Sequence, residues 1–260
     1  MLRHGQQAKR ISSTYHVCAV LYTRLALLRL ETSSLFDVMS KTFPDTKSRL
    51  IFLINTFDLV LTLLAVRDVS HWSFELFGCS VILELMITFA VCPYFDQDIR
   101  ANGVELENDH WKQALHQTIA LFVEEELKPY LGDLISFIRM VEIAGGVSKV
   151  QLEHFERTSF NFSNTWRQSL LAINTSVIQH FSSFKNGTLV LHQVLGQLIV
   201  YYTRFHSLLD EKLQQLGASA GDESSSSTVK ATSTRGWGHQ PVGVQTVMVE
   251  VKKFRSNFMP

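Results

Sequence analysis

The chain has 260 residues, and its 24 Lys and Arg balance 24 Asp and Glu, so the formal net charge is zero. This balance excludes a protein that attracts nucleic acid or an acidic membrane through its overall charge. Hydrophobic residues make up 46% of the chain, whereas Gly and Pro number only 13 and 5. Few helix breakers and an ordinary apolar content predict an all-α protein built from long helices.

Residues 1–44 form a basic segment without clear boundaries, and we expect it to be partly helical. Pro44 and Asp45 interrupt the chain, and Asp45 or Thr46 is a suitable N-cap for a helix that reaches about Val66. Apolar residues recur through this stretch at helical spacing, at Leu50, Leu53, Phe57, Val60 or Leu61, and Leu64. We therefore expect an amphipathic helix here, opening a helical-bundle region over residues 45–216.

A second apolar stripe runs from Trp111 to Val141 and is followed by Gly145 and Gly146. Pro129 lies inside it, where it removes a backbone donor and crowds the preceding turn, so we expect a kink or a break. Glu124 to Glu126 are three consecutive acids, for which the pattern favours a solvated helix face over a pair of catalytic carboxylates.

A third stripe from Glu153 to Phe184 precedes Asn186-Gly187, a pair typical of a left-handed helix end, with Thr188 able to cap a new helix. Whether Phe184–Thr188 is a turn or part of one continuous helix stays open, with the turn favoured. The fourth stripe alternates steps of four and three, the spacing of a heptad seam that we expect to pack against the Phe162–Phe184 helix. This helix-packing seam consists of Leu191, Leu195, Leu198, Tyr202, Phe205 and Leu209.

Residues 217–243 are rich in Ser, Thr and Gly without an apolar period, which predicts a disordered linker. A short C-terminal element follows over residues 244–260. Its alternation allows a strand, but a helix with Val244, Val247 or Met248, Val251 and Phe254 on one side fits the rest of the chain better.

Motifs of catalysis are missing from the sequence: it has no P-loop, dinucleotide-binding glycine motif, serine-hydrolase elbow or zinc-protease helix. His71, Cys79 and Cys92 have a spacing that fits no common zinc module. We therefore predict a non-enzymatic protein with no catalytic residue, no metal site and no cofactor.

Three blocks of sequence resemble the C-terminal portion of the vacuolar protein sorting-associated protein 52 family. They are Arg49–Leu64, Phe122–Glu142 and, as the longest, Trp166–Leu209; Val247–Phe258 is similar to the family's C-terminal end. The family-motif residues in the longest block are Phe184, Asn186, Gly187, Thr188, Arg204, Phe205 and His206. These blocks are helix-packing sequence and contain no catalytic signature.

The resemblance implies an extended stack of antiparallel helical bundles within a subunit of the Golgi-associated retrograde protein complex. Such a complex tethers endosome-derived vesicles at the trans-Golgi network, on its cytoplasmic face. The implied partners are vacuolar protein sorting-associated proteins 51, 53 and 54, or syndetin in place of the last, with syntaxin SNAREs and small GTPases. No nucleic acid is implied, and contact with the membrane would be peripheral, through the complex.

Two departures from the family pattern bear on this expectation. The family's N-terminal coiled-coil region is missing, so we expect a fragment or a truncated form. The resemblance is also interrupted over residues 68–104, which hold the most apolar stretch, Trp72–Phe95. That stretch is long enough for a single membrane span, the alternative interpretation of the chain, although Glu75 and Glu84 disfavour a span. Two further hypotheses for this insertion are a buried bundle helix and a translated retained intron.

Overall fold

The computed structural model describes residues 23–65, 97–181, 183–219 and 240–256. Every regular element in these ranges is a helix, and no strand occurs there, which confirms the predicted all-α fold. The chain divides into two compact units, residues 1–119 and 120–260. The boundary between the units lies inside the long helix α4, Gln97–Ile143.

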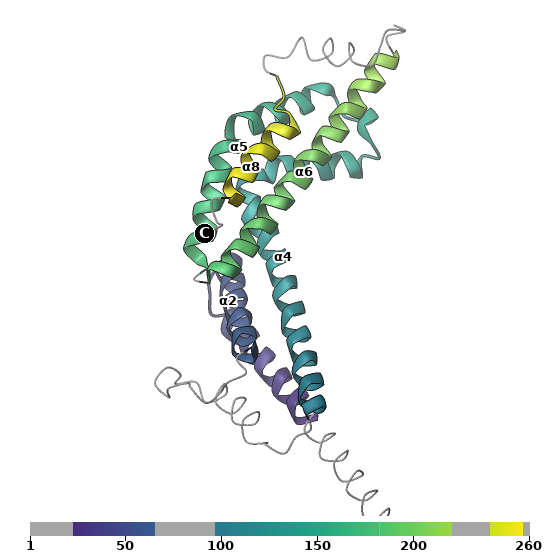
Figure 1. The fold of residues 1–260 in the computed structure, drawn as a ribbon. Helices are drawn as coiled ribbons and strands as arrows, with labels where there is room; N and C mark the ends of the chain where they lie inside the picture. The colour runs from purple at the N-terminus through teal and green to yellow at the C-terminus, as the bar shows by residue number, and fades with distance from the viewer. Residues whose placement is uncertain (1–22, 66–96, 182, 220–239, 257–260) are drawn as a thin grey trace, which may run out of the picture. The chain divides into compact units, whose positions relative to one another are not determined.

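The first unit contains a helix of residues 23–40, helix α2 (Thr46–Ala65) and the N-terminal part of α4 (Figure 1). Asp45 begins α2 as predicted: its carboxylate accepts a hydrogen bond from the Ser48 backbone N–H at 2.7 Å. An aromatic cluster joins the three helices, with the rings of Phe36, Phe57 and Trp111 separated by 5.7–6.3 Å. These rings and the fully buried Ile54 form the core of this unit.

The second unit contains the rest of α4, the short 3-10 helix η2 (Val147–Lys149), α5 (Leu152–His180), α6 (Phe184–Ser219) and α8 (Val244–Ser256). Helices α5 and α6 pack along each other in opposite directions, and α8 lies on α6 (Figure 1). Gly145 and Gly146 end α4 with φ of +80° and +121°, conformations that glycine adopts without strain. The C-terminal element is a helix, as preferred from its sequence, and not a strand.

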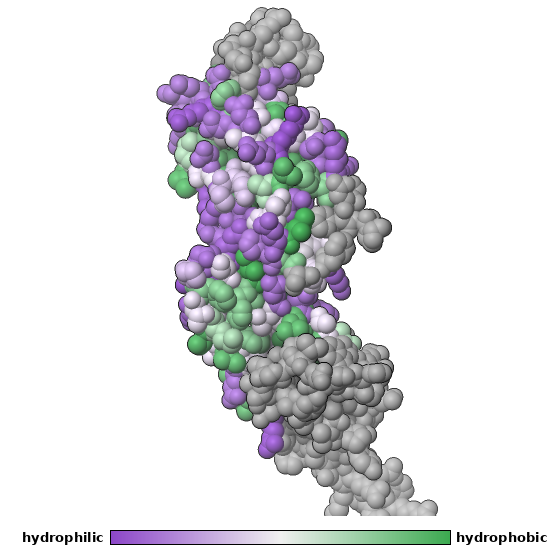
Figure 2. Space-filling model, turned by 90° about the vertical axis from the view of Figure 1, so that its left-hand side faces the viewer, coloured by the Kyte–Doolittle hydropathy of each residue, from purple (hydrophilic) through white to green (hydrophobic). Residues whose placement is uncertain are grey.

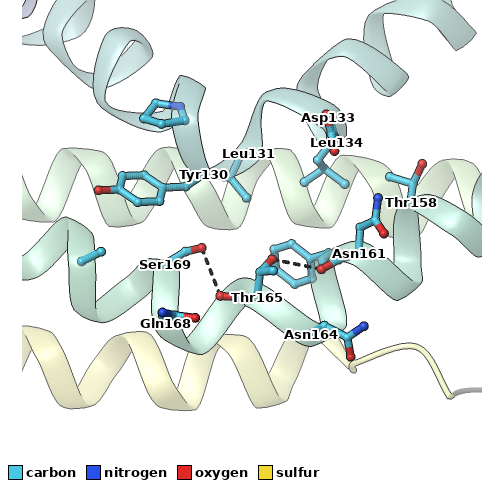
Figure 3. A pocket seen from close by; sticks show the side chains of 13 residues that line it. Tyr130, Leu131, Asp133, Leu134, Thr158, Asn161, Asn164, Thr165, Gln168 and Ser169 are labelled. Atoms are coloured by element: carbon cyan, nitrogen blue, oxygen red, sulfur yellow. Dashed lines mark hydrogen bonds between the residues drawn. The ribbon is translucent and has the colours of Figure 1, made fainter.

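Helix α4 passes through Pro129 without a break, so the expected interruption takes the form of a bend. In Figure 3 the ribbon of α4 descends to Tyr130 and Leu131 and leaves in another direction beyond Leu134. A proline can be kept inside a long helix in this way because the lost hydrogen bond and the ring clash are absorbed by bending.

The change of direction between α5 and α6 lies before the predicted turn. Helix α5 ends at His180, and α6 begins at Phe184, so Phe184–Thr188 is the first turn of a helix. The expectation of a left-handed end at Asn186-Gly187, with Thr188 as cap, is therefore wrong. Ser183 provides the start instead, because its hydroxyl oxygen lies 3.4 Å from the Asn186 backbone nitrogen and its carbonyl accepts from Gly187 at 2.8 Å.

Helix α6 also reaches Ser219, three residues into the range expected to be a linker. Residues 97–104, expected to belong to an insertion, are the first turns of α4. The apolar stretch of residues 72–95, the remainder of the linker up to residue 239, and the zinc candidates His71, Cys79 and Cys92 lie outside the described residues.

Candidate interaction surfaces

The six residues of the helix-packing seam all lie inside the second unit, with at most 2% of each side chain exposed. Tyr202 stacks on Phe162 of α5 with ring centroids 4.0 Å apart, and Phe205 lies 6.2 Å from Phe155. Because these contacts bury the seam between α5 and α6, the seam is a core element and not a surface for partners.

The seam continues to a residue that was not predicted from the sequence. Lys212 lies three positions after Leu209, on the same side of α6, and only 9% of it is exposed. Its ammonium group donates to the carbonyl oxygens of Val147 at 3.1 Å and Ser148 at 3.4 Å. A lysine at the next seam position was the available signal, since a charge on the buried side of a helix must find polar partners.

The family-motif residues of α6 do not converge on one site. At the start of the helix Asn186 is 3% exposed, and among the described residues neither polar atom of its side-chain amide has a hydrogen-bond partner. Gly187 lies beside Phe181, where an added Cβ would come to 3.5 Å from the Phe181 Cβ atom. About five turns later Arg204 forms an exposed ion pair with Glu142 at 3.0 Å.

His206 connects α6 to the segment that leads into α8. Its Nε2 lies 2.8 Å from the carbonyl oxygen of Val242, which also accepts a hydrogen bond from the Tyr202 hydroxyl. Burial raises the pKa of Tyr202 far above its ordinary value, so the hydroxyl keeps its proton and remains a donor. The two side chains thus fix the chain just before α8.

The expectation that Glu124–Glu126 form a solvated face is wrong for Glu126, whereas Glu124 and Glu125 are partly exposed. Glu124 is half-buried and accepts a hydrogen bond from the Tyr201 hydroxyl at 2.8 Å. Burial is the main cause that raises the pKa of Tyr201, and this hydrogen bond is the second. Glu125 pairs with Lys128, whereas Glu126 is fully buried. Consecutive helical residues differ by about 100° in direction, so one of three must turn towards the core in a helix that is packed on several sides.

Exposed hydrophobic side chains are concentrated on the helix of residues 23–40. Leu27, Leu30 and Val38 are 55%, 69% and 60% exposed. Helix α2, next in sequence, is long and apolar enough to cross a membrane by length and composition, a test that the core helix of a soluble protein also passes. Figure 2 shows hydrophobic residues gathered in patches between hydrophilic areas on one face of the molecule. Such patches are common at sites of protein or membrane contact.

A groove of about 540 Å³ lies between α4 and α5 at the bend of α4. Its α4 side includes Tyr130 and Asp133, and its floor includes Leu131, Leu134 and Phe162. Figure 3 shows the α5 side as a row of polar side chains, among them Thr158, Asn161, Thr165 and Gln168. This groove was not predicted from the sequence, although Pro129 opposite a polar stripe of α5 was a signal for it.

Among the described residues, no group of three or more His, Cys, Asp or Glu side chains is placed to hold a metal ion. The groove holds a tyrosine and one carboxylate, with no histidine or cysteine among the residues that line it. The described residues present two candidate surfaces, the exposed apolar helix of the first unit and the polar groove of the second.

Comparison with known proteins gives one consistent name. No model of a protein family matches the chain, and no solved structure matches it either. The vacuolar protein sorting-associated protein 52 homolog of Homo sapiens is 25% identical over 240 residues, which cover 90% of this chain and 26% of that protein. The homolog of Caenorhabditis elegans is 25% identical over 222 residues, covering 84% and 24%.

A plant protein extends the comparison beyond animals. Vacuolar protein sorting-associated protein 52 A of Arabidopsis thaliana is 22% identical over 238 residues, which cover 90% of this chain and 26% of that protein. The chain thus spans about a quarter of the length of the curated relatives it matches. Animal and plant proteins of the same name align with nearly all of it, so the chain is similar over most of its length to the C. elegans, human and plant members of the vacuolar protein sorting-associated protein 52 family.

Proposed function

We propose that this chain is part of a non-enzymatic subunit of a multisubunit vesicle-tethering complex. The observation that carries the proposal is the match of nearly the whole chain to protein 52 homologs of animals and a plant. The fold supports it, because helices that present long faces suit assembly with other helical subunits. The groove and the exposed apolar helix are further surfaces on which such a subunit could bind its neighbours.

In this role the chain acts in retrograde transport from endosomes to the trans-Golgi network, on the cytosolic side of both membranes. Its neighbours are vacuolar protein sorting-associated proteins 51, 53 and 54, or syndetin in a related assembly. Syntaxin SNAREs and small GTPases are the further partners of the complex. Membrane association is peripheral and passes through these partners.

Co-purification tests the proposal directly. The full chain carries an affinity tag in cells, and the three sister subunits are measured in the eluate by quantitative mass spectrometry. We expect their recovery from the wild type and from Val200→Ala, because Val200 is 57% exposed on α6. We expect their loss from Leu198→Asp, which places a charge at a position that is 1% exposed. Wild-type chain that is folded but elutes without any sister subunit contradicts the proposal.

A membrane-spanning protein is the second candidate, favoured by the length and composition of α2. An alkaline carbonate wash of membranes distinguishes the two, since it releases peripheral proteins and leaves spanning ones in the pellet. We expect the chain in the supernatant. Its retention in the pellet would favour the span, and the Arg49 and Asp58 charges within α2 would then have to enter the bilayer at a cost of a few kcal/mol each.

A further inference from the structure

The groove between α4 and α5 has a shape that favours an elongated ligand. Its α5 side runs from Thr158 to Ala172. Within it Thr158, Asn161, Thr165, Gln168 and Ala172 follow in alternating steps of three and four, so these five lie on one face of that helix. Fourteen residues of α-helix extend over roughly 21 Å. The same length accommodates about six residues of an extended peptide, at about 3.3 Å each.

The polar groups of the groove are suited to the main chain of a peptide. Thr158, Thr165 and Ser169 each donate their hydroxyl proton to a carbonyl of α5 four residues earlier, so they present lone pairs. The side-chain amides of Asn161, Asn164 and Gln168 are exposed, and among the described residues they make no hydrogen bond. Each amide offers donors and an acceptor together, which is the pairing that a peptide unit requires.

The charge of the groove selects among peptides. Asp133 is exposed and has no ion-pair partner within the described parts of the chain, whereas no Lys, Arg or His is among the residues that line the groove. A groove whose lining holds one carboxylate and no cationic side chain disfavours phosphate groups and acidic segments and favours ammonium or guanidinium groups. Leu131, Leu134 and Phe162 add an apolar floor that can accept the aliphatic part of a long side chain.

From these three features we propose that the groove between α4 and α5 binds an extended segment of a partner protein, with a lysine or arginine of that segment opposite Asp133. Asn161, Asn164 and Gln168 bind the main chain of the segment, and the floor contacts the stem of the basic side chain. The proposal stands on the groove alone and does not depend on membership of a tethering complex.

A displayed library of random eight-residue peptides tests this on the full chain. We expect selection on the wild type to enrich peptides that contain Lys or Arg, and the same selection on Asp133→Lys to lose them. Glu211→Lys is the matched control, because it reverses a likewise exposed acid of α6 outside the groove and should keep the enrichment. Circular dichroism checks that both variants are folded.

Dissociation constants of a selected peptide then test whether its basic residue contacts Asp133. The best peptide, labelled for fluorescence anisotropy, should bind Asp133→Lys at least about tenfold more weakly than the wild type. Replacing its basic residue with Glu should restore binding to Asp133→Lys and weaken binding to the wild type. The combined variant Asn161→Ala and Gln168→Ala should also bind more weakly.

Three outcomes would overturn the proposal: no enriched peptide, enrichment of acidic peptides, or a best peptide whose affinity does not respond to Asp133→Lys. Enrichment that Glu211→Lys abolishes as strongly as Asp133→Lys would also overturn it, since the effect would then be one of net charge. Failure of this experiment leaves the tethering role intact, because that role is tested by the recovery of sister subunits and not by the groove.

Discussion

Lys212 is a polar residue that we expect to stabilise the fold from within an apolar seam. Its ammonium group connects α6 to the carbonyls of Val147 and Ser148, just after the glycine turn that ends α4. Lys212→Met keeps the aliphatic volume and removes the ammonium donor from both carbonyls, of which that of Val147 still accepts from the Val150 backbone N–H. We expect a loss of about 1–3 kcal/mol in the free energy of unfolding, measured by urea denaturation. Lys253→Met, at an exposed position of α8, should change it by less than about 0.5 kcal/mol.

Glu107 makes the stability of the first unit depend on pH. It is 6% exposed and pairs with Arg29 at 2.9 Å, and burial raises its pKa even though Arg29 acts in the opposite direction. The folded state therefore binds the proton more tightly than the unfolded state, whose value lies near 4.5. The stabilising contribution is complete below that value and is lost as the pH rises through the folded pKa.

We expect Glu107→Gln to remove this dependence, because the amide can still accept from Arg29 but does not ionise. Urea midpoints measured between pH 4 and 7 should fall with rising pH more steeply in the wild type than in the variant. Asp109→Asn, an exposed acid of the same helix, should keep the wild-type slope. A wild-type midpoint that rises with pH while Glu107→Gln stays flat would contradict the raised pKa.

At the scale of the elements, apolar spacing was enough to predict α2, α5, α6 and the part of α4 from Trp111 onward, but not the ends of these helices. Asp45 was identified because an N-cap acts through its own side chain on the next turn. The start of α6 was misplaced because Asn-Gly suggests a turn, whereas Ser183, an unremarkable residue in the sequence, provides the first contacts of that helix. The groove was missed for a related reason: it depends on how α4 bends against α5, which spacing within one helix does not contain.

Helix α8 is held to the second unit by one narrow face. Val247 and Val251 are 0% and 2% exposed, and α8 contacts α6. Val247→Asp buries an unpaired charge, so we expect α8 to detach and its backbone amides to lose their protection from hydrogen exchange. Val249→Asp is the control, since Val249 is 56% exposed and its replacement should leave the protection unchanged. Equal loss of protection in both variants would contradict this docking of α8.

At the scale of the whole molecule, the two units have separate cores although α4 is common to both. The first core is centred on Ile54 and the second includes Leu198, and each residue is at most 1% exposed. Truncation of such residues to alanine costs about 2–5 kcal/mol, and effects at distant sites without shared partners add. Separate cores allow the units to unfold in separate steps, which a single-domain protein of this size would not show.

Differential scanning calorimetry of the full chain can test this. We expect two transitions. Ile54→Ala should lower the midpoint temperature of one, and Leu198→Ala should lower the midpoint temperature of the other. The double variant should lower the midpoint temperatures of both transitions by the amounts seen singly, because the two residues belong to different units. If instead both single variants lower one common transition, helix α4 couples the units into a single cooperative structure. The division at residues 119 and 120 would then be a feature of packing density and not of folding.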